Sequence, residues 1–282
     1  MGCCLLSSAS GDVRRCRRGL QCRMAHRRNR MATDSSRPFF AAQHLAKHFG
    51  GIQAVAEVSL DIAPGEIVGL IGPNGSGKTT TINMLCGALN SDGGKILLDG
   101  ADLTGMAAHF FARHGVARTF QVPRLFRRLS VLENLIVPAL SDRRVKRAAA
   151  EDMADDVLEF LRLSHLSQDY ARSLSGGQQK LLELGRALML DPKLILLDEP
   201  FAGVHPRLLN QIIEHIKALN ERGMTIVLVD HNLDAIRSVV RRVAVMAQGR
   251  KIADGSVDDV LRDPAVIHAY TGSRKSNGRA GS

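Results

Sequence analysis

The chain has 282 residues, of which 45% are hydrophobic and 23% charged, and its 38 basic and 28 acidic side chains give a net charge of +10. This length is enough for one large α/β domain with a smaller lobe. Nine arginines and two aspartates within residues 1–37 carry most of the excess charge, so the remainder is only mildly basic and predicts no nucleic-acid partner.

The apolar and cysteine patterns exclude two further classes. No run of 18 or more apolar residues occurs, so we expect no bilayer-spanning segment, and a role at a membrane would need another chain to span it. Four of the five cysteines lie before residue 38, and only Cys86 lies in the body. This distribution favours a reducing compartment over a disulfide framework or a structural zinc site.

Residues 1–37 contain many Arg and Ser residues without apolar periodicity, so we expect a disordered basic tail there. We expect the natural start at Met24 or Met31, with the arginine-rich stretch an artefact of start-site choice. The predicted folded domain covers residues 38–272, and a second disordered tail is expected over 273–282.

The first half of the predicted domain alternates strands and turns. A half-buried strand is expected at Val58–Ile62, then a turn at Pro64-Gly65 and an apolar strand at Glu66–Ile71 that runs into GPNGSGKT. A helix is expected over Thr79–Leu89. Further strands are expected at Lys95–Leu98 and Val116–Phe120.

An inserted helical lobe is expected over about residues 125–190, because apolar positions recur there at helical spacing. Its expected helices are Val131–Leu140, Asp152–Leu163 and Ser175–Leu190. Strand patterns return at Leu194–Leu197, Thr225–Val229 and Val243–Met246, separated by helices at about Pro206–Glu221 and Asn232–Val240, and Ser256 is expected to cap a final helix. Alternating strands and helices indicate a largely parallel sheet covered on both faces.

Residues 72–79, GPNGSGKT, fit the pattern of a phosphate-binding loop, Gly-x-x-x-x-Gly-Lys-Thr. Glycines let backbone N–H groups converge on phosphate oxygens, and the helix that follows adds its positive end. Lys78 is expected to reach the β- and γ-phosphates of ATP, and Thr79 to hold Mg²⁺. The expected nucleotide-binding residues here are Asn74, Gly75, Ser76, Gly77, Lys78, Thr79 and Thr80.

Two further motifs complete a hydrolytic site. LILLDEP at 194–200 places Asp198 and Glu199 at the carboxyl end of a strand, where Asp198 suits Mg²⁺ and Glu199 suits a general base for an attacking water. LSGGQ at 174–178 reads as a helix start capped by Ser175. Because glycines in a first turn lower helix propensity, Gly176 and Gly177 indicate a second phosphate-binding surface, with Gln178 beside them.

Taken in order, the loop at 72–79, Gln121 after Thr119-Phe120, LSGGQ, LILLDEP and His231 in VDHN resemble the nucleotide-binding subunit of an ATP-binding cassette (ABC) transporter. The resemblance covers about residues 39–272. It implies an α/β fold with a P-loop NTPase core, in which a mostly parallel sheet is flanked by helices, an antiparallel β portion precedes it, and a helical lobe is inserted.

The resemblance also implies roles and partners. Gln121 would contact the metal and the water, His231 would contact the γ-phosphate and order Glu199, and Phe49 would stack on adenine with Val55 alongside. Two subunits, identical or different, would pair head to tail, so that each LSGGQ faces the ATP of the other. The expected partners are transmembrane permease subunits and, indirectly, a periplasmic solute-binding protein, which places the chain peripherally on the cytoplasmic face of the inner membrane.

One position departs from the family pattern, because His205 stands where an acidic or amide residue is usual. Since histidine titrates near neutrality, this departure raises the hypothesis of a pH-sensitive ATPase, which an unchanged pH–rate profile of His205→Asn would contradict.

The finer resemblance is to ATPases of branched-chain amino acid import. It is carried by Phe49-Gly50-Gly51-Ile52, Arg118–Gln121 and Val266–Tyr270. Urea and amide importers and the lipopolysaccharide-export ATPase share much of this pattern and stay open as alternatives. The single set of motifs disfavours a soluble non-transport ABC ATPase. LSGGQ disfavours a P-loop kinase or GTPase, and Glu199 with His231 disfavours a regulator that binds ATP without hydrolysing it.

Overall fold

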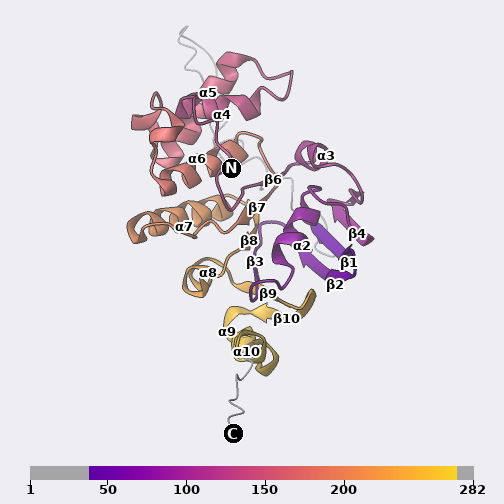
Figure 1. Ribbon diagram of the computed structural model, residues 1–282. Coiled ribbons are helices and arrows are strands. Elements are labelled where there is room, and N and C mark those ends of the chain that lie inside the picture. Colours follow the sequence, from indigo (N-terminus) through magenta and orange to yellow (C-terminus); the bar gives the residue numbers. More distant parts are fainter. Residues whose placement is uncertain (1–37, 272–282) are drawn as a thin grey trace, which may run out of the picture.

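The computed structural model describes residues 38–271, so both expected tails, 1–37 and 273–282, lie outside the described residues. Within that range the strands form a four-stranded sheet in the order β2-β1-β4-β5 and a six-stranded sheet in the order β10-β9-β3-β8-β7-β6 (Figure 1). The strands are β1 Phe40–Phe49, β2 Ile52–Ile62, β3 Ile67–Ile71, β4 Gly93–Leu98, β5 Ala101–Asp102, β6 Val116–Arg118, β7 Leu194–Asp198, β8 Thr225–Val229, β9 Arg242–Ala247 and β10 Arg250–Ser256. The α-helices are α2 Lys78–Leu85, α3 Ala108–Arg113, α4 Val131–Ala139, α5 Arg147–Leu161, α6 Gly176–Leu188, α7 Pro206–Glu221, α8 Leu233–Val239, α9 Val257–Val260 and α10 Pro264–Thr271.

The six-stranded sheet is parallel from β9 to β6, and β10 adds to β9 in the antiparallel sense. This confirms the expected mostly parallel sheet. Because parallel strands end at the same edge, the segments that follow β3, β6, β7 and β8 meet there. Those segments carry the phosphate-loop motif, Gln121, the Asp198-Glu199 pair and His231 respectively.

The strands β3, β7 and β8 are buried along their whole length, so both faces of the sheet are covered there, which explains why these strands are nearly continuous apolar runs. Successive side chains of β3 point to opposite faces. Ile67 and Ile71 join a core that includes α6, α7 and α8, whereas Val68 and Leu70 join a second core with α2 and the antiparallel sheet. The sheet therefore lies between two layers of packed side chains, and this packing holds in place the edge at which the motifs lie.

The antiparallel sheet confirms the expected N-terminal β portion, but it is larger than the sequence indicated. β1 pairs with both β2 and β4, and its register shifts between Ala42 and Leu45 and again near Lys47. His44 has φ 52° within this strand. These irregularities break the strict alternation of buried and exposed residues, so β1 was not expected from the pattern.

Helices α4, α5 and α6 pack on one another, apart from the antiparallel sheet (Figure 1). Ser130 caps α4 through a reciprocal pair of hydrogen bonds with Glu133, the capping-box arrangement. α5 ends at Leu161, and the next residue, Arg162, has a φ of 58°, the left-handed conformation that terminates helices. These helices occupy the region in which an inserted helical lobe was expected.

Some expected bounds were wrong. α2 ends at Leu85 rather than Leu89, since Gly87 takes a positive φ of 67° and breaks the helix. β6 stops at Arg118, two residues before the expected end. The helix that Ser256 caps spans only Val257–Val260, and α10 follows as a separate helix.

Candidate active site

The loop between β3 and α2 needs glycine at two positions for steric reasons. A Cβ at Gly72 would lie 2.1 Å from the Met246 carbonyl oxygen, and one at Gly77 would lie 2.6 Å from the Ala54 carbonyl oxygen. Gly77 also has φ 100°, which favours glycine. The backbones of the neighbouring strands therefore approach the loop so closely that no side chain fits at these two positions.

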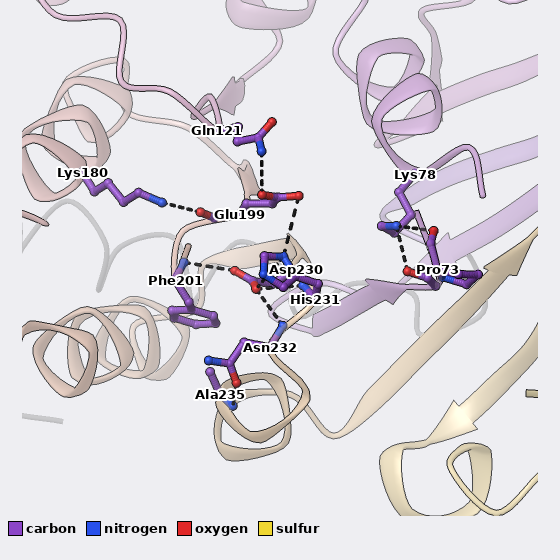
Figure 2. A network of polar contacts seen from close by, with 11 residues as sticks. Pro73, Lys78, Gln121, Lys180, Glu199, Phe201, Asp230, His231, Asn232 and Ala235 are labelled. Atoms are coloured by element: carbon purple, nitrogen blue, oxygen red, sulfur yellow. Dashed lines mark hydrogen bonds and ion pairs between the residues drawn. The ribbon is translucent and has the colours of Figure 1, made fainter. Parts of the chain in front are cut away.

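Two polar side chains point into this loop. Lys78 donates hydrogen bonds from Nζ to the carbonyl oxygens of Gly72 at 2.8 Å and Pro73 at 2.9 Å (Figure 2). Burial lowers the pKa of Lys78, while the negative charges of Glu199 and Asp198 oppose this shift. Ser76 Oγ is buried and has no hydrogen-bond partner among the described residues. A buried hydroxyl without a partner beside a lysine fits a loop built to receive an anion.

A cleft of about 470 Å³ extends from the loop to Glu199 at the carboxyl edge of the sheet. It brings the expected residues of the phosphate-binding loop together with Glu199. Its lining residues are Ile52, Gln53, Ala54, Asn74, Gly75, Ser76, Gly77, Lys78, Thr79, Thr80, Glu199, Gln248 and Gly249. Gln248 and Gly249, which follow β9, were not expected, because nothing in their sequence marks them as neighbours of the loop.

Asp198, at the end of β7, is buried and paired. Its Oδ2 accepts a hydrogen bond of 2.8 Å from Arg118 Nη2, and its backbone N–H donates to Thr119 Oγ1 at 3.3 Å. Arg118 also donates to Asn83 on α2. The guanidinium thus connects the helix after the phosphate loop with the first carboxylate, a role that sequence reasoning missed.

Glu199 lies where three segments converge (Figure 2). Gln121 Nε2 donates to Glu199 Oε2 at 2.8 Å, and His231 Nδ1 lies 3.9 Å from Glu199 Oε1. The backbone of Glu199 has φ 48°, a conformation uncommon for a non-glycine residue. The structure therefore brings together Gln121, Glu199 and His231, the residues expected from three separate motifs.

Asp230 organises the segment after β8 and was not expected as a site residue. It is 1% exposed, and its Oδ1 accepts the backbone N–H groups of His231 at 2.8 Å and Asn232 at 2.9 Å. Its Oδ2 accepts the N–H of Phe201 at 3.0 Å. One buried carboxylate therefore ties the backbone beside His231 to the segment that follows Glu199.

LSGGQ forms the start of α6, where Ser175 and Gln178 make a reciprocal capping box. The two glycines of this motif have different surroundings, and the prediction that they bind a ligand stays a prediction. A Cβ at Gly177 would lie 1.9 Å from Leu208 Cδ2 on α7, so packing alone excludes a side chain there, whereas nothing lies within 4 Å of a Cβ at Gly176. None of the residues 175–178 lines the cleft formed by the chain's own phosphate loop.

Phe49 and Val55, the expected adenine contacts, have different surroundings. Phe49 is 50% exposed, with Lys47 Nζ 5.8 Å from its ring centroid. Val55 is fully buried within the core of the antiparallel sheet and presents no surface to solvent. Neither residue lines the cleft.

His205 caps α7. Its Nδ1 accepts a hydrogen bond from the N–H of Arg207 at 3.3 Å, and Pro206 follows at the first helical position. Aspartate and asparagine cap helices in the same way. The departure at position 205 thus keeps the local capping function, and the proposed pH effect on ATPase activity stays a prediction.

Comparisons with known proteins agree with this geometry. The profile of the family described as "ABC transporter" matches residues 55–202, and that of "Branched-chain amino acid ATP-binding cassette transporter" matches residues 250–275. Among solved structures, the ADP conformation of MJ1267, an ATP-binding cassette of an ABC transporter, superposes with a TM-score of 0.77 at 36% identity, covering 84% of this chain and 100% of that one.

Two curated relatives are similar over nearly their whole length. The probable branched-chain amino acid transport ATP-binding protein LivG of Archaeoglobus fulgidus is 40% identical, over 83% of this chain and 95% of the relative. The lipopolysaccharide export system ATP-binding protein LptB of Escherichia coli K12 is 39% identical, over 82% and 96%. No helix within residues 38–271 has the length and apolar character needed to cross a membrane. The chain therefore belongs to the ABC transporter family, as one of its ATP-binding and ATP-hydrolysing subunits.

Proposed function

We propose that this subunit powers the import of branched-chain amino acids or related small solutes through separate transmembrane subunits. The observation that carries the proposal is the match of residues 250–275 to the branched-chain amino acid cassette family, because this segment lies outside the motifs common to ABC ATPases. Lipopolysaccharide export is the second candidate, and it is favoured by the 39% identity to LptB. Uptake of urea or amides stays an alternative, because the ATPases of those importers resemble this sequence pattern as well.

In the proposed reaction, Lys78 exchanges its two carbonyl contacts for phosphate oxygens of ATP, and the backbone of the glycine loop receives the remaining phosphate charge. Glu199 accepts the proton of the attacking water as general base. Gln121 and His231, which already approach Glu199, hold its carboxylate toward the γ-phosphate.

We infer that Mg²⁺ binds between Thr79, Gln121 and Asp198, because a hydroxyl, an amide oxygen and one carboxylate beside nucleotide phosphates suit this hard cation. Bound Mg²⁺ would neutralise charge on the phosphates. To coordinate Mg²⁺, the Asp198 carboxylate would give up its hydrogen bond from Arg118 or keep it on one oxygen while the other binds the metal.

The proposed adenine contact is Phe49, whose exposed ring is available for stacking. Val55, being fully buried, would support the strand behind the base rather than touch it.

The proposed complete site needs two subunits, as is general for ABC transporter ATPases, which dimerise and act with permease subunits. Ser175, Gly176, Gly177 and Gln178 do not line their own chain's cleft, and Gly176 is open to approach. We propose that this surface binds the ATP held by a second subunit, in a homodimer or a heterodimer.

We propose that the permease subunits dock on a separate groove of about 940 Å³ between α3, the segment after α4 and the segment after α6. Partly exposed large apolar side chains lie on these elements, namely Phe110 on α3, Leu140 after α4 and Leu190 after α6, and Leu190 lines the groove itself. Such exposure is typical of a surface covered by a partner. Docking there would hold the subunit peripherally on the cytoplasmic face of the inner membrane, with a periplasmic binding protein acting only through the permease.

The hydrolytic assignment is tested with Glu199→Gln. We expect the variant to bind ATP with unchanged affinity, to accumulate as an ATP-bound dimer, and to lose turnover by about 100-fold or more, since a general base contributes rate rather than binding. Turnover at the unsubstituted rate would remove Glu199 from this role.

The choice of solute needs the complete transporter. In proteoliposomes that contain this subunit with its permease and binding protein, we expect leucine, isoleucine or valine to stimulate ATP hydrolysis. Stimulation by lipopolysaccharide instead would favour the export reading. Neighbouring genes for two permeases, a binding protein and a second ATPase would favour import.

A further inference from the structure

Lys180 connects the LSGGQ helix to the backbone of the catalytic glutamate within one chain. It lies five residues after Ser175, in the second turn of α6. Its Nζ donates a hydrogen bond of 2.5 Å to the carbonyl oxygen of Glu199 (Figure 2). The side chain is partly buried and lines a small cavity with Phe120, Asp198 and Pro200.

The carbonyl that Lys180 contacts belongs to a backbone that needs support. Glu199 has φ 48°, a left-handed conformation that is unfavourable for a residue with a side chain and persists only where the surroundings hold it. The N–H of Glu199 is held by the Val229 carbonyl at 2.7 Å. Its carbonyl is held by Lys180 and, less closely, by the N–H of Ala202 at 3.3 Å. The direction of the Glu199 side chain depends on both ends of this peptide segment.

The charges around Lys180 favour an ammonium at this position. Burial lowers the pKa of Lys180, and the carboxylates of Asp230, Glu199, Glu183 and Asp198 each oppose that shift. Arg118 pairs directly with Asp198, and Lys180 is a second cation near the same carboxylates. A neutral side chain of the same length would remove both the charge and the donor.

We propose that Lys180 is a positioning residue, which sets the direction of the Glu199 carboxylate by anchoring its left-handed backbone to α6. The proposal rests on the proposed role of Glu199 as general base. Because Ser175 at the start of the same helix is expected to meet the ATP of a second subunit, any displacement of α6 is transmitted by Lys180 to the base in its own chain.

The test compares four full-length proteins with MgATP as the substrate. Lys180→Met removes the donor and the charge, whereas Lys180→Arg keeps both beside the small cavity that Lys180 lines. Lys217→Met, at an exposed position of α7, is the matched control. We expect Lys180→Met to lower kcat about 10-fold or more with the Kd for ATP within twofold, Lys180→Arg to recover most of kcat, and Lys217→Met to match the unsubstituted protein.

Two results would overturn the proposal. One is an unchanged kcat in Lys180→Met. The other is a loss of kcat accompanied by an equal loss of ATP affinity and no recovery in Lys180→Arg, which a general structural role would give. If Lys180→Met fails to fold, Lys180→Gln, which keeps a donor without the charge, takes its place with the same expected separation of kcat from Kd.

A double variant separates this proposal from the proposed function. If Lys180 acts through Glu199, adding Lys180→Met to Glu199→Gln causes no further loss of turnover. A further loss in the double variant would overturn the positioning role while leaving the role of Glu199 intact. Conversely, full turnover in Glu199→Gln alone would refute the general base and, with it, the action of Lys180 through that base.

Discussion

Arg118 Nη2 lies 2.8 Å from Asp198 Oδ2, and the two side chains are only 9% and 7% exposed. A buried ion pair adds little net stability over an apolar pair, but removing one partner leaves a charge in a poorly solvated place. Arg118 also holds Asn83 on α2, so it links the helix of the phosphate loop to the catalytic strand.

We expect Arg118→Met to lower the free energy of unfolding by about 3 kcal/mol, because Asp198 would then be buried without its cation. Arg144→Met is the matched control, since Arg144 pairs with Asp142 at the same 2.8 Å but its side chain is 91% exposed. Urea unfolding of both variants checks the prediction. Equal midpoints for the two variants would mean that Asp198 tolerates the loss of its partner.

The two glycines of LSGGQ are expected to respond oppositely to alanine. Gly177→Ala would force Leu208 out of its position, at a cost of about 1–3 kcal/mol. Gly176→Ala meets open space and would raise stability by up to about 1 kcal/mol, since alanine is the better helix former. Thermal unfolding measures both.

A compensating variant sharpens this comparison. Leu208→Ala removes the side chain that Gly177→Ala would strike, so the double variant should be less destabilised than the sum of the two single ones. If the two losses of stability simply add in the double variant, the contact with Leu208 is not the reason for glycine at position 177.

Lys78→Ala is expected to abolish measurable ATP binding, because the loop would lose the cation that meets the phosphates. The folded protein should persist, since the hydrogen bonds of the Lys78 ammonium within residues 38–271 go to the carbonyl oxygens of Gly72 and Pro73 in its own loop. Isothermal titration with MgATP measures the affinity, and Lys95→Ala, an exposed lysine on β4, serves as the control. Binding retained in Lys78→Ala would contradict the phosphate contact.

The sequence indicated which residues meet at the carboxyl edge of the six-stranded sheet, because these residues follow buried strands whose apolar runs are short and continuous. β8 at Thr225–Val229 and α7 at Pro206–Glu221 have the expected bounds. Gln121, Glu199 and His231 meet because parallel strands place their following residues at one edge, which requires only the correct strand assignments.

The site residues that the sequence did not predict, Arg118 and Asp230, contact partners that are distant in the chain. No pattern in the nearby sequence indicates such contacts. Arg118 meets Asp198 across 80 residues, and Asp230 meets Phe201 across 29. β1 escaped prediction for a local reason, because its register shifts break the alternation on which strand prediction rests. Long-range polar contacts follow from packing, which the pattern of one segment does not contain.

His215 provides a prediction about stability and pH. It is 3% exposed on α7, its ring centroid lies 5.0 Å from that of Phe160, and its Nε2 lies 3.4 Å from Gln211 Nε2. Burial, followed by the positive charge of Arg162, lowers the pKa of His215 to about 4, and the nearby Glu214 opposes this shift. The folded protein therefore keeps this imidazole neutral in a range where the unfolded chain, with an ordinary pKa of about 6.5, binds a proton.

Because the unfolded state binds the extra proton, stability must fall as the pH falls from about 6.5 toward about 4. We expect His215 to account for a loss on the order of 2 kcal/mol across this window, and for a pH dependence that fades within about one pH unit above it. Urea unfolding at pH 7 and pH 5 measures the effect in the unsubstituted protein and in His215→Leu, where the slope between the two should be smaller. His165→Leu, the same change at an exposed histidine, should keep the original slope, and equal slopes in all three proteins would exclude His215 as its source.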